Sequence, residues 1–193
     1  MMIAACGALL ACELGKTGAA APEGTPSERI AKTILGMAQA YADDGVTFNK
    51  TGDPVNALAA FYYGFGWLHF GQAYGMISGP QKIRPSCPFS EPCEILDERY
   101  SEKLAEKTRR YERLLRTARA AVEIAPEPGT DAHDFAARVL VIADAYAGRG
   151  LGMLADGAFE DALAHFSYGH GWMDAAVRTG LFWVKSDRAL FTV

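Results

Sequence analysis

The sequence lacks the motifs that usually mark a catalytic or cofactor site. No glycine-rich phosphate-binding loop follows a predicted strand, and no motif built on a Ser or Cys nucleophile is present. The Glu-x-x-His pairs of carboxylate-bridged metal bundles do not occur either. We therefore predict that the protein needs no cofactor, and the sequence favours a protein that is not an enzyme.

Cysteine is scarce, and its spacing does not suit a zinc site. The four cysteines form two pairs, Cys6 with Cys12 and Cys87 with Cys93, each with about five residues between its members. Structural zinc sites use gaps of about two to four residues, so we predict no metal site. Cys87 and Cys93 lie in a proline-rich loop, which a disulfide or an adventitious metal could clip; a reduced cytosolic pair is the alternative that we prefer.

An excess of basic charge and a long uninterrupted apolar run are also missing. The formal net charge is -4, and the basic residues of segment 103–119 are interleaved with Glu, which indicates a solvated helix face rather than a nucleic-acid surface. The most apolar stretch, residues 54–77, contains Asn56, His69 and Gln72. We predict no nucleic-acid partner and no membrane partner, with nucleic-acid binding through segment 103–119 as a third alternative.

What the sequence does contain is an internal repeat. Residues 31–76 align with residues 136–181 at a constant offset of about 105 positions, with roughly 17 identities in about 45 positions. Segment 57–67 (ALAAFYYGFGW) falls on segment 162–172 (ALAHFSYGHGW). The apolar residues 1–12 lack the basic region of a signal peptide, and the offset places them on the end of a longer helix in the second copy.

The repeat predicts an all-α fold, a helical bundle of five to six helices built from two pseudo-symmetric antiparallel helical hairpins. The N-terminal repeat, residues 1–92, has a truncated first helix, helices over about 26–50 and 54–78, and a Pro/Gly-rich linker over 78–92. The C-terminal repeat, residues 93–193, has helices over about 97–124, 131–155 and 158–184, the second capped by Thr130 or Asp131. Each repeat exposes too much apolar surface to stand alone, so we expect the two to pack face to face as one compact unit.

Two resemblances support this prediction. Segments 52–61 and 157–166 resemble the turn and second helix of a tetratricopeptide repeat, although the 34-residue period is missing. Segment 162–181, ALAHFSYGHGWMDAAVRTGL, resembles the closing pattern of the archaeal DUF357 family of uncharacterised proteins. That resemblance covers about residues 96–185 and, more loosely, residues 31–77. It implies a helical bundle from an archaeal cytoplasm and carries no known activity.

One set of residues is arranged as a catalytic site could be. His170, Asp174 and Arg178 step by four along the last helix, and such an array can fix a histidine tautomer and raise its basicity. The first copy has Phe65, His69 and Ala73 at these places, so we expect the site in the C-terminal half only. The alternative is a structural Asp174–Arg178 pair, with His170 filling a core position as Phe65 does.

Four aromatic residues recur at helical spacing and are the candidates for ligand binding: Tyr63, Trp67, Tyr168 and Trp172. Such duplicated pairs belong more often to a core or an interface than to a ligand cage. Two functions therefore remain open. The first is a helical interaction or scaffold protein that binds a protein partner or itself; the second is a small-molecule-binding or hydrolytic site around His170, Asp174 and Arg178.

Overall fold

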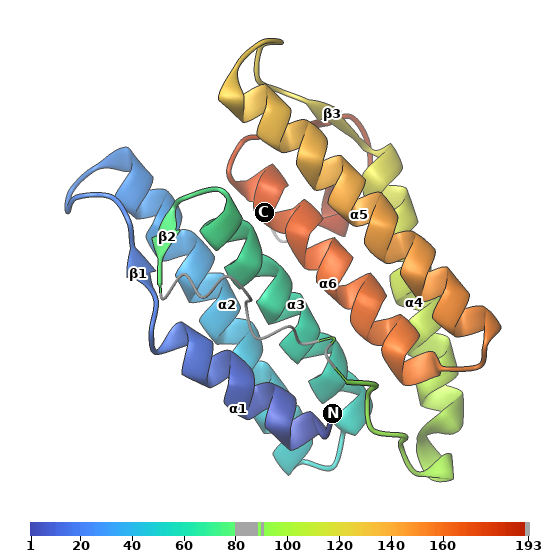
Figure 1. Ribbon diagram of the computed structural model, residues 1–193. Coiled ribbons are helices and arrows are strands. Elements are labelled where there is room, and N and C mark those ends of the chain that lie inside the picture. The colour runs from blue at the N-terminus through green and yellow to red at the C-terminus, as the bar shows by residue number, and fades with distance from the viewer. Residues whose placement is uncertain (80–88, 90, 192–193) are drawn as a thin grey trace.

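The computed structural model describes residues 1–79, 89 and 91–191, and this part of the chain is an all-α bundle with two very small sheets (Figure 1). The fold class predicted from the repeat is therefore confirmed. The helices and strands are α1 (Ile3–Leu14), β1 (Gly18–Ala19), α2 (Pro26–Lys50), α3 (Pro54–Ala73), β2 (Ile77–Ser78), α4 (Ser101–Ala120), β3 (Val122–Ile124), α5 (Asp131–Ala155), α6 (Phe159–Arg178) and β4 (Phe182–Val184), with short 3-10 helices at Glu98–Tyr100 and Arg188–Leu190.

The two copies keep the same element boundaries. Helix α5 repeats the bounds of α2 at the offset of the sequence repeat, and α6 repeats those of α3. Thr25 and Thr130 begin α2 and α5 in the same way, because each hydroxyl accepts a backbone N–H of the first turn at 3.2 Å. Of the two caps predicted for α5, the structure uses Thr130.

Three helices are shorter than predicted. The helix expected over 54–78 ends at Ala73, the one over 158–184 ends at Arg178, and the one over 97–124 spans only Ser101–Ala120. Gly75 and Gly180 follow α3 and α6 with φ of 75° and 79°, a left-handed conformation that ends a helix. The chain then turns into β2 and β4, which pair antiparallel with β1 and β3. Strands of two or three residues are too short to show the alternation of polar and apolar residues that marks a strand, so they were not predicted from the sequence.

Each repeat forms a group of three helices, and the two groups meet along α3 and α6. Figure 1 shows α1, α2 and α3 on one side, α4, α5 and α6 on the other, and α3 beside α6 at the centre, both running in the same direction. Helix α3 is buried from Ala57 to Gly71, and α6 from Ala162 to Ala176. Within the described ranges, no helix has both the length and the apolar character needed to cross a membrane.

Two glycines set the distance between α3 and α6. A Cβ placed on Gly66 would lie 2.5 Å from the carbonyl oxygen of Tyr168, and one on Gly171 would lie 2.5 Å from the carbonyl oxygen of Tyr63. Gly66 and Gly171 are equivalent positions of the two copies. The helices therefore touch backbone to backbone on the pseudo-two-fold axis, a contact that only residues without a side chain permit.

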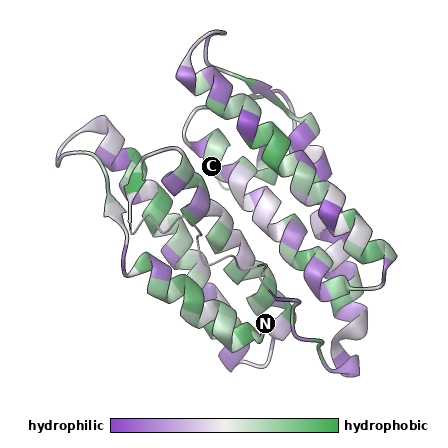
Figure 2. Ribbon diagram, viewed as in Figure 1, coloured by the Kyte–Doolittle hydropathy of each residue, from purple (hydrophilic) through white to green (hydrophobic). Residues whose placement is uncertain are grey.

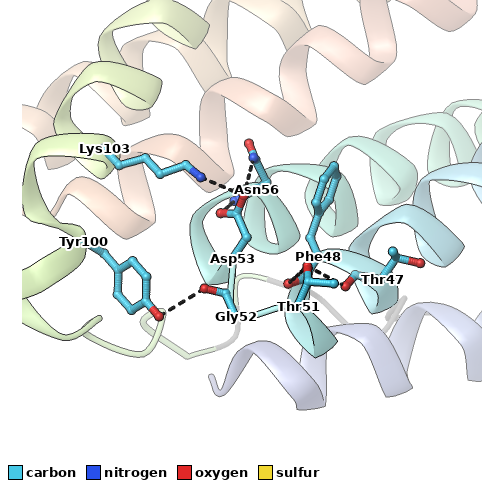
Figure 3. A network of polar contacts seen from close by, with 8 residues as sticks. All are labelled: Thr47, Phe48, Thr51, Gly52, Asp53, Asn56, Tyr100 and Lys103. Carbon is cyan, nitrogen blue, oxygen red and sulfur yellow. Dashed lines mark hydrogen bonds and ion pairs between the residues drawn. The ribbon is translucent and has the colours of Figure 1, made fainter.

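A second contact joins the repeats at the end of the bundle. Helix α4 extends further at its N-terminus than α1 does, and this extension reaches the turn between α2 and α3 (Figure 3). Lys103 Nζ donates to Asp53 Oδ2 at 2.7 Å, and Tyr100 Oη donates to the carbonyl of Gly52 at 3.1 Å. Asp53 also accepts the backbone N–H of Asn56 and so caps α3. The second repeat thus holds the N-terminal end of the helix on which it packs.

We predict that Gly66→Ala destabilises the protein by about 1–3 kcal/mol, because the new methyl group forces the α3 and α6 backbones apart. Gly36→Ala is the matched control. Gly36 also lies inside a helix of the first repeat, but a Cβ there meets nothing within 4 Å, so the substitution should stabilise by up to about 1 kcal/mol. Urea unfolding measures both changes, and equal effects would contradict the close contact.

Candidate functional site

Two of the predicted site residues meet around a tyrosine of the other repeat. The hydroxyl of Tyr63, on α3, donates to Asp174 Oδ2 at 2.7 Å, and His170 Nδ1 lies 3.0 Å from the same hydroxyl oxygen. The single hydroxyl proton of Tyr63 goes to the carboxylate, so Nδ1 of His170 must donate to the tyrosine oxygen. All three side chains are buried, and His170 and Asp174 come from α6.

His170 does not have the raised basicity that an array with Asp174 and Arg178 could give it. Burial lowers the pKa of the imidazole to about 4, and the opposing effect of the Asp174 carboxylate is smaller. The rings of Tyr63, Tyr111 and Phe191 surround it at centroid distances of 5.4, 6.5 and 6.4 Å. The imidazole is neutral at pH 7, and its Nε2 is buried without a hydrogen-bond partner in the described part of the chain.

The first copy contains a matching cluster, which the sequence analysis did not expect. His69 occupies the place of Asp174, and its Nδ1 lies 3.0 Å from the hydroxyl of Tyr168, the equivalent of Tyr63. Nε2 of His69 lies within hydrogen-bond distance, 3.1 Å, of Glu13 Oε2 on α1, where the second copy has Ala118. Each tyrosine therefore reaches across the interface to the other repeat, while the combination of His170, Asp174 and Arg178 stays specific to the second copy.

Arg178 does not share the environment of the other two predicted residues. It is exposed in the last turn of α6, whereas the rest of that helix is buried up to Ala176. The step of four residues brings the three Cα atoms to one side of the helix, but the neighbouring helices cover only its earlier turns. The stacked array of imidazole, carboxylate and guanidinium is thus divided between the core and the surface.

The four aromatic binding candidates are all buried. Trp67 is fully buried, and Tyr63, Tyr168 and Trp172 are no more than 6% exposed. Tyr63 contacts Tyr41 of α2 at a centroid distance of 4.4 Å, and Tyr168 contacts the equivalent Tyr146 of α5 at the same distance. They lie in the contacts between helices and between repeats, as residues of a core or an interface do, and not at a surface where a ligand could reach them.

The metal candidates give no centre in the residues described. Cys87 lies outside them, and Cys93 is a buried free thiol 3.5 Å from the hydroxyl of Tyr62. Cys6 lies 4.0 Å from the same hydroxyl. Burial raises the pKa of the Cys93 thiol and so disfavours the thiolate that binds metals. No group of three or more His, Cys, Asp or Glu side chains that could hold a metal ion is found in these ranges.

Comparison with known families agrees with the internal repeat. The family model described as a protein of unknown function, DUF357, matches residues 8–77 and 110–182. The chain belongs to the DUF357 family. The two matched stretches correspond closely at the offset of the repeat, so the first copy, from the second half of α1 onward, carries the family domain as the second copy does. Searches of curated proteins and of solved structures found no match.

We predict that Tyr63→Phe destabilises this DUF357 protein by about 1–3 kcal/mol, because it leaves the buried Asp174 and His170 without their shared partner. Tyr168→Phe is the matched control. It removes the equivalent hydroxyl, but His69 keeps its hydrogen bond with Glu13, so the loss should be smaller. Urea unfolding at pH 7 measures the difference, and a larger loss for Tyr168→Phe would contradict this assignment.

We also predict that His170 makes the protein less stable as the pH falls. Its pKa is about 4 in the folded state against 6.5 for the free group, so the unfolded chain binds the proton more readily. The part of the unfolding free energy that comes from the neutral His170 is fully present above pH 6.5, and it falls by about 2 kcal/mol between pH 7 and pH 5. His170→Phe, which copies Phe65, should flatten the pH profile of unfolding by that amount. His165, whose pKa burial also lowers, is present in both proteins and cancels in the comparison.

Proposed function

We propose that the protein is a non-enzymatic interaction module that pairs with a second copy of itself through the outer face of α5. The observation that carries the proposal is an exposed apolar strip on this helix. Val141 is 66% exposed and Leu151 is 49% exposed. Ala145, Gly148 and Gly152 continue the strip at steps of four and three residues, the spacing of a helix packing face.

The small residues of the strip fit a second helix. A Cβ placed on Gly148 or on Gly152 would meet nothing within 4 Å, so the space above both glycines is open. Inside the molecule, Gly66 and Gly171 bring α3 and α6 together by the same means. A second α5, related by a two-fold axis, would repeat this arrangement and bury Val141 and Leu151 of both copies.

The charged residues beside the strip already have partners within the chain. Asp144 accepts hydrogen bonds from Arg119 of α4 at 3.0 and 3.2 Å. The guanidinium groups of Arg138 and Arg149 lie over the rings of Phe135 and Tyr146. Figure 2 shows hydrophobic segments recurring between hydrophilic ones along α5. The Asp144–Arg119 pair has no net charge, and the guanidinium groups of Arg138 and Arg149 are held against rings of their own chain.

The equivalent face of α2 lacks the strip. Asp43 and Thr47 stand where α5 has Gly148 and Gly152, and Gln39 donates a hydrogen bond to Asp43 at 2.9 Å. Val46 is the equivalent of Leu151 and is 39% exposed. The second repeat alone therefore presents the interaction face, and the first repeat supplies an internal control.

Leu151→Lys should shift a wild-type dimer to the monomer, because it places a charge in the apolar contact. Val46→Lys, at the equivalent position of α2, should leave the dimer unchanged. Light scattering during gel filtration over a range of protein concentrations measures the molecular mass. A wild-type protein that stays monomeric at about millimolar concentration, far above the Kd of typical specific interfaces, would contradict the proposal.

Tyr63, His170 and Asp174 are buried together, which argues against a hydrolytic or small-molecule site at His170, Asp174 and Arg178. A general base needs contact with substrate and a pKa near the working pH, and His170 has neither.

An archaeal cytoplasm, which the family resemblance implies, is part of the proposal. The free buried thiol of Cys93 suits a reducing compartment.

A further inference from the structure

A pocket of about 310 Å³ opens between the first turns of α2 and the end of α6. Its size lies at the lower end of the range for small-molecule sites, about 300–1,000 Å³. It draws on both repeats and lies apart from the outer face of α5. Its lining consists of Pro26, Arg29, Ile30, Thr33, Arg178 and Thr179.

The pseudo-equivalent place on the other side of the molecule is filled with side chains. Tyr74 there takes the place of Thr179, and Phe135 takes the place of Ile30. The two rings stack at a centroid distance of 4.7 Å and an angle of 19°, and the guanidinium of Arg138 lies over Phe135. The pocket therefore exists because the chain has small residues at Thr179 and Thr33 where the other side has Tyr74 and Arg138.

The charge of the two places differs as well. Arg29 and Arg178 line the pocket, and their equivalents are Asp134 and Ala73. Neither arginine has an ion-pair partner in the described part of the chain; Arg29 only donates to the carbonyl of Gly24 at 3.4 Å. The acidic neighbour of Arg29 in α2, Glu28, is bound by Lys32 at 2.7 Å and by the N–H of Gly24 at 2.7 Å. The pocket thus has two unneutralised guanidinium groups.

We infer that this pocket binds a small organic anion, a phosphate or carboxylate that carries an apolar group. Guanidinium groups bind both oxyanions with paired hydrogen bonds, and two of them on opposite helices can hold one anionic group between them. Ile30 and Pro26 offer the apolar surface for the rest of the ligand. The inference is independent of self-association, because it uses no residue of α5.

Isothermal titration calorimetry of the full chain with phenyl phosphate and with benzoate tests the inference and separates the two oxyanions. Binding of either one supports it, and the stronger of the two identifies the anionic group. Benzyl alcohol, which has the ring without the charge, should not bind. Inorganic phosphate should bind more weakly than phenyl phosphate, and equal binding would overturn the apolar part of the site.

Variants connect the binding to the pocket. Arg178→Gln and Arg29→Gln should each weaken binding about tenfold, the value of one charge-assisted hydrogen bond. Thr179→Tyr should abolish binding by filling the pocket as Tyr74 fills its counterpart. Arg138→Gln, at the equivalent of Thr33, should leave binding unchanged, and the urea midpoint of every variant checks its folding. No binding of either anion at about 5 mM, or equal affinity in all variants, would overturn the inference.

Discussion

The close approach of α3 and α6 is the constraint on which the rest of the structure depends. Gly66 and Gly171 occupy equivalent places in the two copies, and the absence of a side chain at both lets the carbonyls of Tyr168 and Tyr63 face the opposite helix at contact distance. A bulkier residue at either position would separate the helices. At the observed distance the tyrosine hydroxyls cross the interface, and the polar groups of each repeat bond to residues of the other.

Within that interface the two copies differ at a few buried polar positions. The second copy has His170 and Asp174 where the first has Phe65 and His69. Glu13 contacts His69, so each copy has one histidine and one carboxylate in this region. His69, His170 and Asp174 each hydrogen-bond to a tyrosine hydroxyl of the other repeat, which offsets part of the cost of removing them from water. The same burial removes the basicity of His170. The cluster therefore joins the two repeats across their interface, with an uncharged imidazole at pH 7.

The outer surfaces of the two copies also differ, and these differences leave an exposed strip and a pocket. Small residues give α5 an apolar strip that α2 lacks, and Thr179 leaves a pocket where Tyr74 fills the equivalent space. Exchanging a side chain on a duplicated scaffold changes a surface without changing the packing beneath it. Self-association and anion binding are thus proposed for positions at which the copies differ, while the shared residues maintain the fold.

The helices and their pairing could be predicted from the amino-acid pattern, because apolar periodicity, threonine caps and the repeat are local or internal patterns. It also placed Tyr63, His170 and Asp174 among the residues of interest. The packed structure was needed to show that Tyr63 bridges the other two, that His69 contacts Glu13 and Tyr168 in a matching way, and that Arg178 lies outside these contacts. Burial and contact across the interface depend on the distance between the packed helices. The spacing of residues along one helix gives no information about that distance.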